Sequence, residues 1–342
     1  EVPSRGLGDV YKRQEDALKQ SQRINFENQS IIGSINLKGA TIDDLTFKNY
    51  NTDLESNKKV TLLGPRNIEN GYLIESGFVT SDKNIDIPNS ETIWRVIGNN
   101  KLTDQSSIKL LWTNNQGITF EKEISLDDKY LFTIRQSVIN SSNNKYDFYS
   151  YGQIIRNKIP EISNFYILHE GLIATLDDEL IEEDYDDIQE KKFTKTAQKG
   201  WLGIGDKYWI TSLIPPSERE FKTTFDYKKK FRANFITTEP LELGENSKIE
   251  EEFQIIVAAK RVDIIDGYAE SLNIDKFDLV IDWGFLYFIT KPLFFGIDYF
   301  FKQLGNYGLA IIAITICIRL AFFPLANFSF RSMAKMKALQ PE

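Results

Sequence analysis

Two of the residue types that build covalent and metal sites are almost missing from this chain of 342 residues. There is one cysteine, Cys317, so a disulfide within the chain is excluded. There is one histidine, His169, which removes most metal sites and the catalytic triads that use a histidine base. We interpret His169 as an ordinary surface or hydrogen-bonded histidine. No glycine-rich phosphate loop and no catalytic serine motif stands out, so we expect no cofactor, no metal and no enzymatic activity.

Positive charge is also in short supply. The chain carries 41 basic and 49 acidic residues, a net charge of -8 and a pI of about 5.1. Because nucleic acids are bound by basic surfaces, we exclude a nucleic acid as partner. Hydrophobic residues make up 42 % of the chain, which is enough for a packed core in one large domain or two ordinary ones.

The two ends do not look like parts of a fold. Asp9–Gln14 reads DVYKRQ, the translation of a sequencing-library adaptor, and we interpret residues 1–14 as an artefact. Residues 331–342 begin a new helical pattern, which we interpret as the start of a cytoplasmic segment. We therefore expect a fragment that is truncated at both ends.

Residues 22–259 alternate between apolar and polar side chains, which is typical of half-buried strands. We predict a hairpin of 108–112 and 118–124, because a glycine-containing turn joins them. We predict a second hairpin of 131–140 and 146–156 across a polar turn. Many short strands separated by Asn, Gly and Ser turns favour a large β-sandwich domain.

The period changes after the strands. Apolar residues recur at three- and four-residue steps over 260–273, so we predict an amphipathic helix that closes the β domain. Residues 283–304 are apolar but interrupted by Lys291, Asp298 and Lys302, whose spacings place them on one helical face. We predict a helix that lies in the membrane interface, with a true membrane span as the alternative.

Residues 307–330 are long and apolar enough to cross a membrane. At 1.5 Å per residue, about 20 residues cross the hydrocarbon layer of roughly 30 Å. Twelve Leu, Ile and Phe side chains contribute roughly 4–7 kcal/mol to insertion, whereas the central Arg319 opposes it by about 3 kcal/mol. We therefore predict a transmembrane helix in spite of Arg319.

The flanking charges orient this helix. Arg331, Lys335 and Lys337 follow it directly, while Asn306 and Tyr307 precede it. The positive-inside rule places the C-terminal end in the cytoplasm and the β domain outside, which is the periplasm in a bacterium with two membranes.

Arg319 is the best candidate for a functional residue. It lies about 18 Å along the helix axis from Tyr307, so its side chain either reaches the cytoplasmic head groups or lies inside a helix bundle, where ionisable groups mark a pathway or a partner. Thr315 lies one turn earlier and is expected to help orient the guanidinium. Pro324 is expected to free a carbonyl and bend the helix.

Two further patterns suggest binding sites but have simpler interpretations. Residues 177–190 contain nine carboxylates, yet the spacing of a calcium loop is missing, so a solvated loop is favoured. Trp201 and Trp209 would suit a carbohydrate, but we favour core packing for both rings.

Three segments near the C-terminus form a specific pattern: IDWGFLYFITKPLF (281–294), GNYGLAIIAITICIRLAFFPL (305–325) and SMAKMKALQP (332–341). In this order and spacing they resemble the YidC family of membrane protein insertases. Upstream, GSINLKGATIDDLTFKNY (33–50) and GWLGIGDKYWITSLIP (200–215) look like the large periplasmic domain of Gram-negative members. The resemblance covers residues 24–342.

This resemblance implies a periplasmic β-supersandwich that is similar in fold to sugar mutarotases. It also implies an interfacial helix and the first helix of a five-helix core in the inner membrane, which the complete protein crosses several times. An arginine at the position of Arg319 would then lie in a hydrated groove that receives hydrophilic, often acidic tails of nascent membrane proteins. The partners implied are these substrates, the lipid bilayer and the Sec translocon.

Two other classes of function stay open at this point. A membrane-tethered carbohydrate-binding or carbohydrate-active sandwich is suggested by the tryptophans and the many carboxylates. A structural domain that docks onto translocon components is the third interpretation. The chain also departs from the family pattern, because it lacks the N-terminal anchor, the cytoplasmic hairpin and the other core helices; we attribute this to truncation.

Overall fold

The computed structural model describes residues 14, 16–53, 55–160, 169–217, 219–284 and 286–339. The chain divides into two compact units, 1–281 and 282–342, which we call the β unit and the helical unit. Except for Gln14, the predicted adaptor segment 1–14 lies outside the described residues.

The β unit contains two large sheets that enclose one hydrophobic core. The first sheet has the strand order β14 (Phe193–Ala197), β17 (Phe221–Tyr227), β18 (Phe231–Thr237), β11 (Tyr146–Arg156), β5 (Tyr72–Val79), β3 (Thr41–Asn51), β2 (Ile31–Asn36), β1 (Arg23–Glu27) and β7 (Lys101–Leu102), with β19 (Leu241–Leu243) paired to β11 and β4 (Lys59–Leu63) paired to β3. The expected β-sandwich is confirmed.

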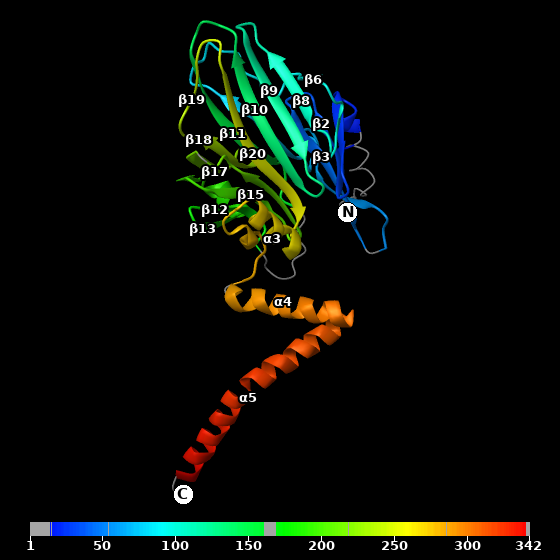
Figure 1. Ribbon diagram of the computed structural model, residues 1–342, viewed down its shortest axis with the longest axis vertical. Helices are drawn as coiled ribbons and strands as arrows, with labels where there is room; N and C mark the ends of the chain where they lie inside the picture. Colours follow the sequence, from blue (N-terminus) through cyan, green and yellow to red (C-terminus); the bar gives the residue numbers. More distant parts are fainter. Residues whose placement is uncertain are drawn as a thin grey trace, which may run out of the picture. The chain divides into compact units, whose positions relative to one another are not determined.

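The second sheet contains β20, the longest of the described strands, and β9, β10 and β20 lie side by side in Figure 1. Its strand order is β13 (Glu179–Asp184), β12 (Gly171–Leu176), β15 (Gly200–Gly205), β16 (Trp209–Ile214), β20 (Lys248–Ala259), β10 (Leu131–Asn140), β9 (Ile118–Leu126), β8 (Ile108–Thr113) and β6 (Arg95–Ile97). Among the described strands of both sheets, neighbours are antiparallel except β1 and β7.

The local pattern explains the strands. Along β9, every second side chain from Ile118 to Leu126 is buried, as the side-chain period of two requires. Ile108 pairs with Ile124 and Thr113 with Thr119, so the predicted hairpin of β8 and β9 is confirmed. Each large apolar side chain buried in this way stabilises the fold by about 1.5–3 kcal/mol.

The second predicted hairpin is wrong. Both strands form at the expected residues, but β10 pairs with β9 and β20, whereas β11 pairs with β5, β18 and β19 of the other sheet. The segment 141–145 therefore carries the chain from one sheet to the other. Asn140 stabilises this connection between the sheets, because its side-chain amide donates hydrogen bonds to the carbonyls of Asn144 (2.7 Å) and Gly244 (2.8 Å).

Two short helices end the β unit. Helix α3 (Val262–Ser271) lies within the predicted segment 260–273, and it buries Ile265 and Tyr268. The Tyr268 hydroxyl donates a hydrogen bond to Asp127 Oδ2 (2.7 Å) and thereby fixes the helix to the loop before β10. The 3₁₀ helix η1 (Phe277–Val280) follows and buries Phe277 against Trp201.

The helical unit consists of α4 (Tyr287–Leu304) and α5 (Tyr307–Leu339). Gly305 ends α4 in the left-handed conformation (φ 66°), a common end for helices because glycine has no Cβ. The Asn306 side chain then accepts a hydrogen bond from the Leu309 amide (3.2 Å) and begins α5. The two-residue link makes the helices fold back into a hairpin, with α5 starting at the end of α4 (Figure 1).

Candidate functional site

Helix α5 contains Arg319, the residue that the sequence singled out. Residues Tyr307–Met333 are apolar and long enough to cross a membrane, which confirms the predicted transmembrane helix. The helix does not end at Phe330 but continues to Leu339. Among the described residues, Arg319 is exposed and makes no hydrogen bond or ion pair with another part of the chain.

Helix α4 covers only one face of α5. Ala310 is fully buried, and Gly296 of α4 lies against Ile314. At about 100° per residue, Arg319 lies about 180° around the helix from Ala310. The guanidinium therefore extends from the face of α5 that α4 leaves open, and α4 does not form a wall around it.

The predicted support of Arg319 by Thr315 stays a prediction. Thr315 lies about 40° around the helix from Arg319, so the two side chains share a face. The Thr315 hydroxyl, however, donates a hydrogen bond to the Ile311 carbonyl of its own helix (2.7 Å). Pro324 lies inside α5, where it has no N–H for the Leu320 carbonyl, and α5 bends along its length in Figure 1.

Helix α4 has the composition expected of an interfacial helix. None of its side chains is buried in the chain, and several large apolar ones are more than a third exposed: Tyr287, Phe288, Ile289, Phe294, Phe295, Tyr299 and Leu304. Asp298 and Lys302 form an ion pair of 2.7 Å one turn apart. The Lys291 ammonium lies 5.8 Å from the centre of the Trp283 ring. The helix starts at Tyr287, four residues later than expected, and its place in the interface remains a prediction.

The two tryptophans considered for a carbohydrate belong to the core. Trp201 is fully buried and packs edge-on against Phe277, with ring centres 5.3 Å apart. Trp209 is stacked on Phe47 at 4.5 Å, and Tyr50 packs against it at 5.1 Å. Core packing is thus confirmed, and the aromatic argument for a carbohydrate platform is lost.

The acidic segment 177–190 is not the expected loop. It forms β13 and helix α2 (Tyr185–Glu190), because Ile181, Tyr185 and Ile188 are buried at intervals that fit a strand and then a helix. Most of its carboxylates are exposed. In the part of the chain that the structure describes, no three Asp, Glu, His or Cys residues are arranged to hold a metal ion.

His169 lies beside this segment. Its Nδ1 is 3.3 Å from Asp184 Oδ1, and its side chain is only 12 % exposed. The Nε2 atom has no hydrogen-bond partner among the described residues. The histidine is therefore mostly buried and paired with one carboxylate, so the prediction of a surface or fully hydrogen-bonded histidine is met only in part.

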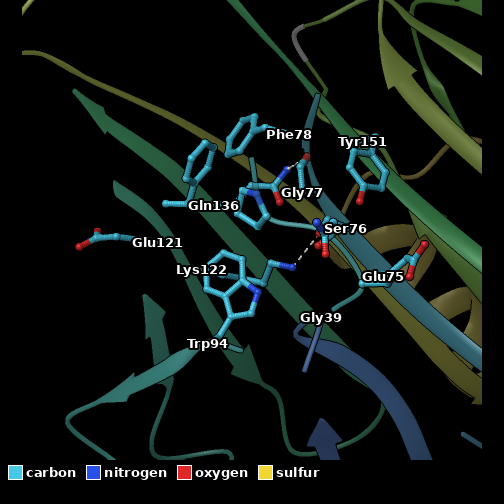
Figure 2. A pocket seen from close by; sticks show the side chains of 14 residues that line it. Gly39, Glu75, Ser76, Gly77, Phe78, Trp94, Glu121, Lys122, Gln136 and Tyr151 are labelled. Carbon is cyan, nitrogen blue, oxygen red and sulfur yellow. Dashed lines mark hydrogen bonds between the residues drawn. The ribbon is translucent and has the colours of Figure 1, made fainter. Parts of the chain in front are cut away.

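The sequence interpretation missed a polar pocket between the two sheets. Figure 2 shows Lys122 and Gln136 from the second sheet extending towards Ser76 and Gly77 of the first, with Trp94 beside the lysine. The signal was present in the sequence, because Lys122 occupies an inward position of β9 between Phe120 and Ile124. A lysine at such a position breaks an otherwise regular apolar alternation.

In the part of the chain that the structure describes, a β-sandwich is followed by an apolar helix long enough to cross a membrane, which is the arrangement of a membrane protein with a large extramembrane β domain. Two family models match the chain: the YidC periplasmic domain over residues 23–295, and the 60Kd inner membrane protein over residues 299–342. The chain belongs to the YidC family. Its β unit is accordingly periplasmic, and its helical unit belongs to the inner membrane.

Curated relatives named membrane protein insertase YidC match nearly the whole chain. The protein of Pelagibacter ubique is 71 % identical over 327 residues, which are 96 % of this chain and 59 % of the relative. That of Rickettsia prowazekii is 42 % identical over 332 residues, or 94 % and 59 % of the two chains. The chain thus spans about three fifths of the length of these relatives.

The β unit also has the fold of a known group of solved structures. A galactose mutarotase related enzyme from Lactobacillus acidophilus superposes with a TM-score of 0.51, covering 69 % of this chain and 97 % of that enzyme at 12 % identity. At this identity the similarity concerns the fold alone. It agrees with the expected likeness to sugar mutarotases.

Proposed function

We propose that the complete protein is a membrane protein insertase and chaperone and not an enzyme. It inserts inner-membrane proteins and helps them to fold, alone or with the Sec translocon. The observation that supports this most directly is the family membership over nearly the whole chain, with relatives that are named insertases. The membrane-length apolar helix α5, with the exposed Arg319 in it, fits the same role.

Arg319 is proposed to bind the hydrophilic tails of substrates. Its side chain lies on the open face of α5, on the side turned away from α4. A cation in a water-containing groove with low-dielectric walls attracts an acidic tail more strongly than a cation in bulk water does. A fixed carboxylate partner would cancel this attraction, and Arg319, which is exposed, forms no ion pair with a described residue of the chain.

The proposed topology brings the substrate past this residue. Arg331, the first basic residue after the span, lies at the cytoplasmic end, while Tyr307 lies at the periplasmic end. Arg319 then lies about midway between these two ends of the span. A tail that enters from the cytoplasm would meet it there. The apolar part of the substrate would leave sideways into the lipid, which accepts it without cost.

The test uses the complete protein reconstituted into vesicles. Arg319→Glu is expected to reduce insertion of a substrate with an acidic translocated tail at least tenfold, and Arg319→Lys to reduce it much less, because only the glutamate reverses the charge. A substrate with an uncharged tail should be inserted nearly equally by both variants.

Arg331→Glu serves as the matched control, because it makes the same reversal of charge but lies at the end of the span. Equal insertion of the acidic tail by the wild type and Arg319→Glu would disprove the charge role of Arg319. Loss of insertion for every substrate, in a variant that is correctly folded, would show instead that Arg319 is structural.

A further inference from the structure

Lys122 lies where an apolar side chain is expected. Along β9 the inward positions are Ile118, Phe120, Lys122, Ile124 and Leu126, and the lysine is only 2 % exposed. Its ammonium group donates a hydrogen bond to the Ser76 carbonyl of the opposite sheet (2.8 Å) and lies 5.5 Å from the centre of the Trp94 ring. Among the described residues it has no ion pair with a carboxylate.

This burial perturbs the lysine. Removal from water lowers the pKa of Lys122 to about 8, and the more distant charge of Glu75 only partly opposes the effect. A buried ammonium group retains two N–H donors beyond the one that Ser76 accepts. Such donors are usually paired, because leaving them unpaired costs free energy.

Two more polar atoms in the same pocket lack a partner. Gln136 is the cross-strand neighbour of Lys122, and its Nε2 donates hydrogen bonds to the Gly77 carbonyl (3.0 Å) and the Ser150 hydroxyl (2.8 Å). The Oε1 atom of Gln136 and the Nε1 atom of Trp94 have no hydrogen-bond partner among the described residues. Gln136 is 1 % exposed and Trp94 is 5 % exposed.

The pocket has room for a few atoms. Its inner space is about 40 Å³, bordered by both sheets and by the loop of Pro88, Asn89 and Ser90. Since one water molecule needs roughly 10–15 Å³ by this measure, about three heavy atoms fit. In Figure 2 the Trp94 nitrogen and the Lys122 ammonium group both border this space.

The donors and the acceptor define the chemistry of a ligand. Lys122 and Trp94 offer N–H groups, while Gln136 offers a carbonyl oxygen. A carboxylate could accept from the first two but would be repelled by the Gln136 oxygen and by Glu75, which also lines the pocket. A metal cation would be repelled by Lys122, and an apolar group would leave all three unpaired. A hydroxyl group both accepts and donates, so it satisfies the set.

We propose that this pocket binds the hydroxymethyl end of a small neutral polyol such as glycerol or a sugar. The hydroxyl oxygen accepts from Lys122 and Trp94, and the hydroxyl hydrogen is donated to Gln136 Oε1. The rest of the ligand extends past the loop 88–90 towards solvent. This site is independent of Arg319 and of the insertase activity.

The test titrates the full chain, in detergent micelles and with its tryptophan indoles labelled with ¹⁵N, with glycerol, glucose and sodium acetate in turn. The Trp94 signal, assigned by its absence in Trp94→Phe, should shift with glycerol or glucose and saturate. The tighter binder of glycerol and glucose shows whether the hydroxymethyl group of the preferred ligand belongs to a linear polyol or to a sugar. Acetate should have no comparable effect.

Variants then locate the binding. Lys122→Met and Gln136→Met should each weaken polyol binding about fivefold, the usual effect of one lost hydrogen bond. Trp94→Phe keeps an aromatic ring but removes the N–H donor, so it should weaken polyol binding by a similar factor. Calorimetry measures the binding to this variant. The exposed Lys129→Met is the control and should bind as the wild type does, and the midpoint of unfolding shows which variants are folded.

Three results would overturn the proposal. The first is a resolved Trp94 signal that neither polyol shifts, which would mean that the pocket holds only water. The second is tighter binding of acetate than of glycerol, which would make it an anion site. The third is unchanged polyol binding in both Trp94→Phe and a folded Lys122→Met.

Discussion

Gly296 of α4 lies so close to Ile314 of α5 that a Cβ atom added to the glycine would come within 2.8 Å of Ile314 Cδ1. The stacked rings of Phe301 and Tyr307, with centres 3.8 Å apart, close the same helix hairpin near its turn. The hairpin is therefore fixed at two points. The angle of the helix that contains Arg319 depends on the absence of a side chain at position 296.

Gly296→Leu is expected to push α5 away from α4 and to open the hairpin by several ångströms. Gly296→Ala should open it less, because the end of the Ile314 side chain can move. Double electron–electron resonance between spin labels at Tyr299 and Leu320, in a Cys317→Ser background, measures the separation. Gly308→Ala is the control, since its added Cβ would approach only Asn306. An unchanged distance in Gly296→Leu would contradict the role of this contact.

Arg156 and Asp206 form a buried ion pair that joins the two sheets, and both side chains are close to 90 % buried. Arg156→Met should lower the free energy of unfolding by about 3–5 kcal/mol, because it leaves a buried carboxylate unpaired. The double variant Arg156→Met/Asp206→Asn should cost clearly less than the sum of the single changes. Chemical denaturation followed by near-UV circular dichroism measures this coupling.

The exposed ion pair of Lys158 and Glu69 is the control for this set of single and double variants, with an N–O distance of 3.2 Å. Lys158→Met should change the free energy of unfolding by less than about 1 kcal/mol, because water screens the pair. Strictly additive effects at Arg156 and Asp206 would show that the buried pair does not act as a unit.

Lys122 should make stability depend on pH above neutrality. Its pKa is about 8 in the folded chain against 10.5 for a lysine in water, so unfolding takes up a proton between these two pH values. The free energy of unfolding should therefore rise as the pH increases from 8 to 10.5, by roughly 3 kcal/mol relative to Lys122→Met. Parallel denaturation curves of the wild type and the variant check this, and a constant difference between them would contradict the assigned pKa.

Trp201 should contribute more to stability than Trp209. Trp201 has no exposed surface, so Trp201→Ala is expected to lower the free energy of unfolding by about 3–5 kcal/mol through the cavity that it leaves. Trp209→Ala should cost less, because Trp209 is only partly buried. If both variants are equally stable and one of them loses affinity for a sugar, the packing interpretation is wrong for that residue.

The strands could be predicted because their pattern is local. The alternation from Ile118 to Leu126 identifies β9 and its buried face without knowledge of the rest of the chain. Its partner β8 is also predictable, because the Gly-containing turn is short. The apolar helix Tyr307–Met333 is predictable for a similar reason: the free energies of insertion add up residue by residue, so one arginine is outweighed.

Sheet membership could not be predicted in the same way. The turn 141–145 is as suitable for a crossing between sheets as for a hairpin, and the side chains of β10 and β11 fit either arrangement. The pairing was decided by distant strands, β20 for β10 and β5 for β11. The acidic segment 177–190 was misjudged for the same reason, because three buried residues outweigh the repulsion of its exposed carboxylates.

The sequence by itself determined that a β-sandwich is followed by a membrane helix with Arg319 in it, because hydrophobic periodicity and length are properties of short segments. Only the tertiary structure decided that Lys122, Gln136 and Trp94 meet between the sheets. Only it showed that α4 covers the face of α5 opposite Arg319. Such arrangements depend on contacts between residues far apart in the chain. The free energy of these contacts depends on several segments together and cannot be predicted from one of them.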